Sequence, residues 1–272
     1  DWKVYLNALE CMYHKHPVKL DITGTIETIS KINKEILYKC YNTFYNPSNM
    51  VMVISGDFEP NEVLEEIKKR ILPKESEGEI KRIFEEEPKD VVKNKVEQKM
   101  EVSKPIYTIG IKDVPAENNE KVKKHIAIEI LLNILVGASS EWFKDLYDIG
   151  NTYSTPSFEY EFDTNYAHIL ITGQSNNPDE LFEKFKEQIK KIIDEGINKE
   201  DFERTRRMIY GEYVKEYNDV VDIARMFLSD YFKGINSFEY LEEINIISLE
   251  YVNQILKEVF QEKKIILSVV KS

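Results

Sequence analysis

Apolar residues recur at helical spacing in three segments near the start of the chain, residues 1–14, 34–45 and 61–72. Asn33 is placed to cap the second of these helices, whose apolar stripe is formed by Ile36, Leu37, Cys40, Tyr41 and Phe44. Between the second and third helices, residues 50–54 form a continuous apolar run, which is short enough for a buried strand. The pattern therefore predicts two helices, a strand and a further helix, in that order.

The next segment, residues 73–90, changes in character. Pro73, Gly78 and Pro88 interrupt a run that is rich in Glu and Lys and has few residues able to enter a core. We predict that this segment is an exposed linker.

The remainder of the chain has the pattern of a complete domain. Strands are predicted at residues 96–102 and 106–111, a helix at 118–136, a short helix at 140–148, strands at 153–162 and 166–172, helices at 178–195, 199–216, 219–233 and 249–259, and a last strand at 265–270. Gly137 follows the first of these helices and ends it.

An internal repeat links the two parts of the chain. Residues 26–54 align with residues 241–269 without gaps, at an offset of 215 positions, and their apolar positions coincide. The cap residue Asn33 falls on Ser248, which is also a capping residue type. A first repeat of the same length would begin roughly 120 residues before Asp1, so the chain is expected to hold the tail of one repeat and the whole of another.

Charge and composition restrict the possible partners. The net charge of −12 argues against a nucleic-acid binder, which needs a basic face to displace phosphate counterions. No apolar run approaches the roughly 18 residues of a membrane helix, so we expect no membrane partner. The two cysteines, Cys11 and Cys40, do not make a disulfide framework, and we predict a reducing, cytoplasmic setting.

Several short motifs are similar to those of one enzyme family. They are His16-Pro17, Gly24-Thr25-Ile26-Glu27-Thr28-Ile29, Phe44-Tyr45-Asn46-Pro47-Ser48-Asn49-Met50, Gly56-Asp57-Phe58, and, in the second repeat, Gly137-Ala138-Ser139-Ser140 with Leu146-Tyr147. Together they resemble the pitrilysin/insulinase (inverzincin) family of zinc metallopeptidases, in particular the bacterial two-repeat members of the processing-peptidase type.

The resemblance implies an α+β fold of the processing-peptidase (LuxS-like) type. Each repeat would have an antiparallel-rich sheet with helices packed on it, and the two repeats would face each other around a closed chamber. On this reading residues 1–72 are the C-terminal part of the first repeat, residues 73–94 the linker, and residues 95–272 the second repeat. The family's zinc motif, His-x-x-Glu-His, would lie on a helix of the first repeat, where its Glu activates a zinc-bound water.

That zinc motif is absent from this sequence. The four histidines are His14, His16, His125 and His168, and none belongs to a His-x-x-Glu-His run. The positions of the second repeat that match the motif, Ile128, Leu131 and Leu132, are apolar. We therefore predict no catalytic residue, no metal ligand and no cofactor in this chain, with zinc bound elsewhere in the full-length protein.

Two tyrosines match the positions of residues that hold substrate in the family. An Arg and a Tyr of the second repeat bind substrate backbone there, and the matching positions are Tyr147 and Tyr153. Tyr147 departs from the Arg, which puts that contact in doubt. The alternative is that both tyrosines have a packing role only.

Two functions follow from the resemblance. In the first, the chain is the C-terminal portion of a zinc metalloendopeptidase, inactive alone, with a peptide substrate, the missing N-terminal part and a homo- or heterodimeric subunit as partners. In the second, it belongs to a non-catalytic partner or structural subunit of a peptidase assembly. The presence or absence of His-x-x-Glu-His upstream distinguishes them.

Overall fold

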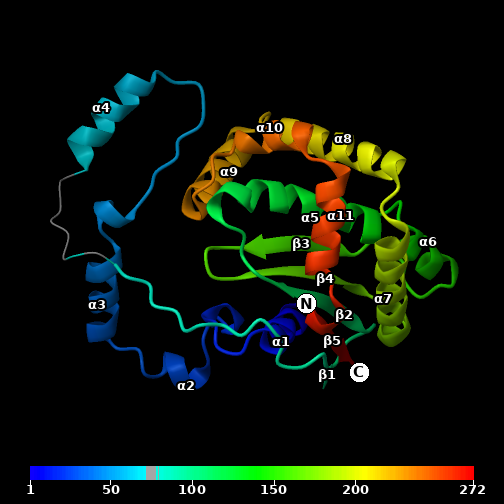
Figure 1. The fold of residues 1–272 in the computed structure, drawn as a ribbon. Helices are drawn as coiled ribbons and strands as arrows, with labels where there is room; N and C mark the ends of the chain where they lie inside the picture. Colours follow the sequence, from blue (N-terminus) through cyan, green and yellow to red (C-terminus); the bar gives the residue numbers. More distant parts are fainter. Residues whose placement is uncertain (72–77, 79) are drawn as a thin grey trace. The chain divides into compact units, whose positions relative to one another are not determined.

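The computed structural model describes residues 1–71, 78 and 80–272, and its contacts divide the chain into two compact units (Figure 1). The first, which we call the sheet unit, comprises residues 1–20, 84–214 and 238–272. The second, which we call the helical unit, comprises residues 21–83 and 215–237. Each unit is described by itself.

A five-stranded sheet forms the centre of the sheet unit. Its strands are β1 (Lys95–Lys99), β2 (Ile106–Asp113), β3 (Ser157–Phe162), β4 (Ala167–Gln174) and β5 (Ile265–Lys271), in the spatial order β1-β5-β2-β4-β3. Only the β1–β5 pair is parallel, and the other three pairs are antiparallel. The predicted α+β class with an antiparallel-rich sheet is confirmed. The inner strands β2, β4 and β5 are buried along most of their length because both faces of the sheet are covered.

One face of this sheet is covered by helices that lie between β2 and β5 in the sequence. They are α5 (Lys121–Val136), α6 (Glu141–Asp148), α7 (Pro178–Glu195), α8 (Lys199–Glu216), α10 (Glu239–Ile246) and α11 (Leu249–Val259), and α5 packs against β3, α10 and α11. The stretch 118–148 is long and apolar enough to cross a membrane by composition, contrary to our reading of the sequence, but most of its apolar window is buried inside the unit. α5 is apolar because the rest of the sheet unit buries it on several sides, so its composition does not require a membrane.

The opposite face is covered by the first helix of the chain, α1 (Trp2–Met12), which lies across β2 and β5. Its buried side chains form one apolar cluster with Leu170 and Ile266, and four of them, Ala8, Leu9, Cys11 and Met12, are fully buried. Gly110 permits this close approach, because a Cβ there would lie 3.0 Å from both Met12 and Ile266. The sheet is therefore enclosed between a helix from the start of the chain and helices from residues 121–259.

The helical unit contains α2 (Ile26–Ile29), α3 (Lys34–Phe44), α4 (Pro60–Arg70) and α9 (Val220–Lys233). Neither α3 nor α4 has a buried residue. The apolar stripe of α3 is exposed, with Leu37 at 59% and Phe44 at 49% of full accessibility. Among the described residues, this stripe is therefore largely open to solvent.

One predicted strand is absent from the structure, and two short helices of the structure were not predicted. The strand predicted at residues 50–54 is wrong: the segment is not assigned to any strand, because the described part of the chain supplies no neighbour for a ladder. The short helices α2 and α10 were not predicted, since four and eight residues carry little periodic signal.

The two copies of the repeat have matching helix boundaries and matching N-caps. α3 and α11 begin and end 215 positions apart, and so do the 3₁₀ turns at residues 47–49 and 262–264. The side chains of Asn33 and Ser248 both accept a hydrogen bond from the backbone N–H three residues on. The helical part of the repeat prediction is therefore confirmed, whereas only the second copy continues into a strand, β5.

The predicted linker lies partly outside the described residues, which omit 72–77 and 79. Its later part, from residue 84, belongs to the sheet unit and is not wholly exposed as predicted. The N–H groups of Val92 and Lys93 donate to the carbonyl oxygen of Cys11 at the end of α1, at 2.7 and 3.2 Å. Residues 1–20 likewise pack with the second repeat, while the domain boundaries inferred from the sequence remain a prediction.

The packing of α1 can be tested with two leucines that differ in burial. Leu9→Ala should lower the free energy of unfolding by about 2–5 kcal/mol, because it leaves a cavity beneath α1. Leu37→Ala, at an exposed position of α3, should change it by less than about 0.5 kcal/mol. Urea denaturation of the two variants checks this, and equal effects would contradict the position of α1 on the sheet.

Candidate functional site

Helix α6 places Tyr147 on the surface of the sheet unit. The Ser140 hydroxyl caps α6 by accepting from the N–H of Phe143 at 3.1 Å. Trp142 and Leu146 form the buried side of the helix, which leaves Tyr147 on the opposite side, 55% exposed. Its ring lies 6.0 Å from that of Phe143, which is its one ring contact among the described residues.

The loop between α6 and β3 holds Tyr153 more firmly. Gly150 adopts φ 68°, which lets the chain turn sharply after α6. The Asn176 side chain donates both to the carbonyl oxygen of Gly150 and to the Tyr153 hydroxyl, each at 2.8 Å. The Lys104 ammonium lies 4.0 Å from the centre of the Tyr153 ring. Tyr153 is thus oriented by two neighbours while it remains 57% exposed.

The two tyrosines have separate partners, so the structure orients Tyr153 and leaves Tyr147 with aromatic contact alone. An exposed, oriented phenol is able to bind a peptide carbonyl, and it loses little conformational freedom when it does so. The proposed role of Tyr147 and Tyr153 in substrate binding remains a prediction.

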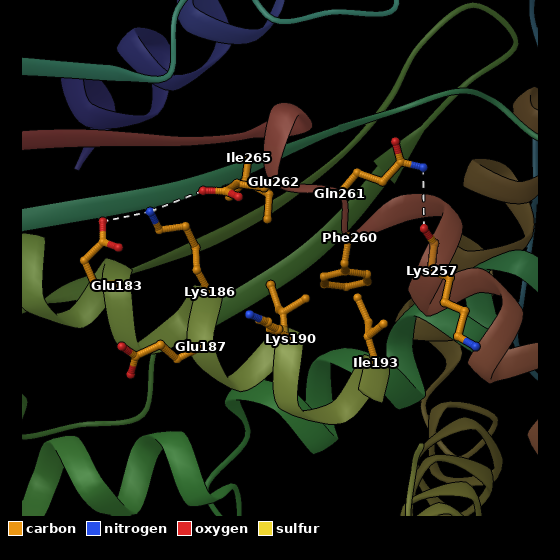
Figure 2. A pocket seen from close by; sticks show the side chains of 11 residues that line it. Glu183, Lys186, Glu187, Lys190, Ile193, Lys257, Phe260, Gln261, Glu262 and Ile265 are labelled. Atoms are coloured by element: carbon orange, nitrogen blue, oxygen red, sulfur yellow. Dashed lines mark hydrogen bonds and ion pairs between the residues drawn. The ribbon is translucent and has the colours of Figure 1, made fainter. Parts of the chain in front are cut away.

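A separate pocket of about 400 Å³ lies between α7 and the segment that joins α11 to β5 (Figure 2). Phe260 and Ile265 form part of its apolar floor, and Lys186 reaches across to Glu183 and Glu262, at 2.8 and 3.7 Å. Its lining contains no His, Cys, Ser or Thr. The pocket lining therefore has no imidazole base and no hydroxyl or thiol nucleophile, and its polar side chains are carboxylates, lysine ammonium groups and one amide.

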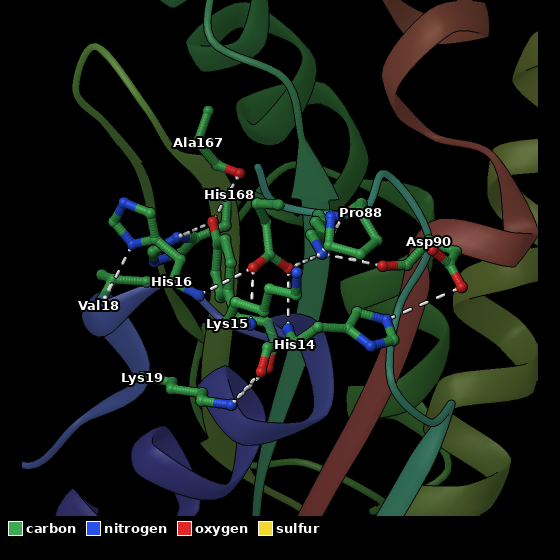
Figure 3. A network of polar contacts seen from close by, with 12 residues as sticks. His14, Lys15, His16, Val18, Lys19, Pro88, Asp90, Ala167 and His168 are labelled. Carbon is green, nitrogen blue, oxygen red and sulfur yellow. Dashed lines mark hydrogen bonds and ion pairs between the residues drawn. The ribbon is translucent and has the colours of Figure 1, made fainter. Parts of the chain in front are cut away.

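A buried polar network fixes the end of α1 and the start of the segment that follows residue 83 (Figure 3). The Glu87 carboxylate accepts from the backbone N–H groups of His14, Lys15 and His16, each at 2.8 Å, and from Lys112 at 2.6 Å. Burial alone would raise the pKa of Glu87, but these four donors lower it to about 2. The Lys112 ammonium also donates to the carbonyl oxygens of Pro88 and Asp90.

His168 lies on the same face of the sheet and is fully buried. Its Nδ1 atom lies 2.9 Å from the Tyr13 hydroxyl and its Nε2 atom 3.2 Å from Glu161. The Tyr13 hydroxyl also donates to the carbonyl oxygen of Ala167 at 3.0 Å. This network could not be predicted from the sequence, because Glu87 lies in a Glu-rich run and its partners are more than 20 residues away.

The described residues, which leave out only 72–77 and 79, contain no group of three His, Cys, Asp or Glu side chains that could hold a metal ion. The positions that match the zinc motif, Ile128, Leu131 and Leu132, are at most 1% exposed in the core of α5. This part of the chain therefore does not fit a catalytic zinc, which needs three converging N, O or S ligands. The expectation that the whole chain binds no metal remains a prediction.

The Glu87 network predicts that replacement of this one carboxylate by an amide lowers the free energy of unfolding strongly. Glu87→Gln removes the negative charge and leaves the buried Lys112 without its anion, so it should lower the free energy of unfolding by about 2–4 kcal/mol at pH 7. Glu86→Gln, at the exposed neighbouring position, should cost less than about 0.5 kcal/mol. Urea denaturation measures both, and a similar small effect of the two changes would contradict the network.

The ion pair between Glu87 and Lys112 also predicts that the free energy of unfolding depends on pH. Because the folded-state pKa of Glu87 is about 2 and its ordinary value is 4.5, its stabilisation is present in full above about pH 4.5 and is lost as the pH falls towards 2. The difference in stability between the wild type and Glu87→Gln should therefore narrow over this range. A difference that stays constant from pH 7 to pH 3 would show that the charge of Glu87 is not responsible.

Comparison with known proteins agrees with the fold and with the apolar residues at the positions that match the zinc motif. Residues 31–209 match the family model described as the peptidase M16 inactive domain. The zinc protease YmfH of Bacillus subtilis, itself described as uncharacterized, is 32% identical over 262 residues. This alignment covers 95% of the present chain and 61% of YmfH, so the chain spans less than two thirds of that relative's length.

Solved structures show the same fold. An M16-like peptidase from Alicyclobacillus acidocaldarius is 30% identical and superposes with a TM-score of 0.92, over 99% of this chain and 66% of that one. A protease from Helicobacter pylori, 18% identical, superposes with a TM-score of 0.86 over 99% of this chain and 67% of that one.

The resemblance to the pitrilysin/insulinase metallopeptidases is thereby confirmed. The match to the inactive domain is consistent with the absence of a His-x-x-Glu-His run and with the apolar residues at the matching positions of α5. The chain belongs to the peptidase M16 family and carries its inactive, C-terminal domain.

Proposed function

We propose that this chain is the C-terminal portion of a zinc-dependent endopeptidase, in which it completes a closed chamber and contacts the peptide substrate. The observation that carries this proposal is the match to the M16 inactive domain, together with a relative, 32% identical, that is named a zinc protease. Zinc, bound by the missing N-terminal part, would supply an activated water for hydrolysis of the peptide bond. The chain by itself would be inactive.

Within the full-length protein, this chain would orient the substrate. Tyr153 is held by Asn176 and Lys104 with its ring and hydroxyl accessible, so it can accept or donate a hydrogen bond to a peptide backbone. Correct placement of the scissile bond lowers the barrier without any chemical step by the placing residue. Tyr153 is thus a positioning residue in this proposal.

The missing N-terminal part is the partner that best accounts for the helical unit. Met50, Met52 and Ile54, which match buried β5, are 44–61% exposed. Burial of apolar area contributes about 25 cal/mol per Å², so covering a few hundred Å² would stabilise the unit by several kcal/mol. We propose that residues 50–54 form a strand once the first repeat supplies a neighbouring strand.

Helix α9 is a second element of the helical unit for which we propose a partner in the first repeat. Shifted by 215 positions, α1 falls on residues 217–227, which overlap α9 (Val220–Lys233). Val220, Val221, Tyr231 and Phe232 of α9 are 49–61% exposed. In this proposal α9 covers the sheet of the first repeat as α1 covers the sheet of the second, so that the two repeats exchange one helix each.

A non-catalytic role in a peptidase assembly is the second candidate. The observation that favours it is Tyr147, which stands where the resembling enzymes have an Arg that holds substrate. A His-x-x-Glu-His run upstream of Asp1 would favour the enzyme, and its absence would favour this alternative.

We further propose a cytoplasmic location and a homo- or heterodimeric assembly. Both cysteines are unpaired, Cys11 buried and Cys40 exposed, and an exposed thiol persists most readily in a reducing compartment. Burial raises the pKa of Cys11 to about 11, so this thiol is inert at neutral pH.

The enzymatic proposal predicts an effect of Tyr153 on substrate use. In the full-length protein, Tyr153→Phe should lower kcat/KM for an unfolded peptide by about tenfold, the factor for one lost hydrogen bond of about 1.4 kcal/mol. Tyr210→Phe, at an exposed tyrosine of α8 in the sheet unit, is the matched control and should leave kcat/KM unchanged. Equal activity of the two variants would show that Tyr153 does not touch substrate.

The proposed partner predicts a change in hydrogen exchange. Amides of residues 34–56 should exchange rapidly in the present chain and become protected in the full-length protein, because α3 and the strand would then be buried. Residues 121–136 serve as the internal control and should be protected in both. Equal protection of residues 34–56 in the two proteins would contradict a docked first repeat.

A further inference from the structure

The pocket between α7 and the segment that joins α11 to β5 combines a buried apolar floor with a charged rim (Figure 2). Ile189, Phe260 and Ile265 of the floor are at most 4% exposed, and Ile193 lines the pocket beside them. The volume of about 400 Å³ is within the range of small-molecule sites, which are mostly apolar and have a few polar groups that orient the ligand. The pocket therefore has the size and the composition of a binding site.

The pocket is long and narrow. Its lining runs along α7 from Glu183 to Ile193, which is about 15 Å at a rise of 1.5 Å per residue. At one end Ile193 and Phe260 point toward each other, and at the other Lys186 extends between Glu183 and Glu262 (Figure 2). A volume of about 400 Å³ spread over this length accommodates an extended alkyl chain better than a compact ring system.

Three of the six charged side chains of the rim already interact with one another. The Lys186 ammonium lies 2.8 Å from Glu183 and 3.7 Å from Glu262. Within the described ranges 1–71, 78 and 80–272, no ion pair or side-chain hydrogen bond is found for the other three, which are Glu187, Lys190 and Lys257. A ligand in the pocket therefore meets two available ammonium groups and one available carboxylate.

These charges favour an anion as the ligand. The lining as a whole has three lysines and three glutamates and is neutral, on a chain whose net charge is −12. It therefore lacks the excess negative charge that would repel an anion from most of the surface. A cation would be opposed by both Lys190 and Lys257 and could use only Glu187, since Lys186 already compensates the other two carboxylates.

We propose that this pocket binds the ionised form of a medium-chain carboxylic acid. The alkyl chain lies along the floor formed by Ile189, Phe260 and Ile265, where it is removed from water. The carboxylate accepts a charge-assisted hydrogen bond from an available lysine of the rim, Lys190 or Lys257, whose flexible stem follows the apolar surface. Because the lining has no imidazole, hydroxyl or thiol, the acid is bound and not converted. This inference goes beyond the proposed peptidase function and does not depend on it.

Methyl NMR of the whole chain tests where the acid binds. The probe is decanoate, titrated into protein that is ¹³C-labelled at the δ1 methyl groups of isoleucine. The methyl groups of Ile189, Ile193 and Ile265 should shift in one saturable process, because the alkyl chain contacts them. Ile36, on the exposed apolar stripe of α3, is the internal control and should not shift at the same concentrations. Equal shifts at Ile36, or no shifts in the pocket, would overturn the site.

Three related compounds test the class of ligand by the same methyl shifts. Decanol has the same chain without a charge and should bind at least threefold more weakly than decanoate. Decyltrimethylammonium, which has the opposite charge, should bind at least tenfold more weakly. Hexanoate should also bind at least tenfold more weakly, because four fewer methylene groups are buried. Equal affinities of decanoate and decanol would refute the preference for an anion, and equal affinities of decanoate and hexanoate would refute the apolar floor.

Two double variants test the lysines of the rim. Lys190→Gln with Lys257→Gln should weaken binding of decanoate at least threefold and leave that of decanol within twofold, because only the charged ligand loses a partner. Lys184→Gln with Lys263→Gln is the matched control, since it removes the same charge from the same part of the unit but outside the pocket lining. It should alter neither affinity more than twofold. Thermal unfolding verifies that both double variants are folded, and equal weakening by the two would show a general charge effect and overturn the proposal.

Discussion

The sheet of this domain depends on a helix from the start of the chain, α1, which precedes every strand of the sheet. β2, β4 and β5 carry apolar side chains on both faces, so each face must be covered. The helices that lie between β2 and β5 in the sequence cover one face only, and α1 covers the other. Without α1, the apolar face formed by Leu170 and Ile266 would meet water, and the inner strands would no longer be enclosed on both sides.

The polar network reinforces this arrangement at the end of α1. The helix ends at Met12, and the backbone N–H groups of residues 14–16, which follow it, need acceptors; Glu87 supplies one carboxylate for all three. The same carboxylate compensates Lys112, which would otherwise be a buried charge without an anion. One side chain therefore connects the start of the chain, the segment after residue 83 and strand β2.

Most of the fold could be predicted from the sequence because local signals determine it. α7, α8 and α11 begin and end where capping residues and apolar periodicity predict. Residues 50–54 have the composition of a strand but not its partner, and a strand exists only in a ladder, so the prediction failed there. Tyr147 and Tyr153 were found by resemblance. The Glu87 network could not be found, since it depends on residues brought together by the fold.

The position of α1 has a consequence for synthesis of the protein. Ser268 of β5 donates a hydrogen bond to the carbonyl oxygen of Val4 in α1, across 264 residues of sequence. At a translation rate of about 5–20 residues per second, α1 leaves the ribosome tens of seconds before β5 has been made. During this interval Leu9 and Met12 of α1 lack the part of their apolar cluster that β5 supplies through Ile266. The two-sided core of the domain therefore cannot be completed until β5 has been made.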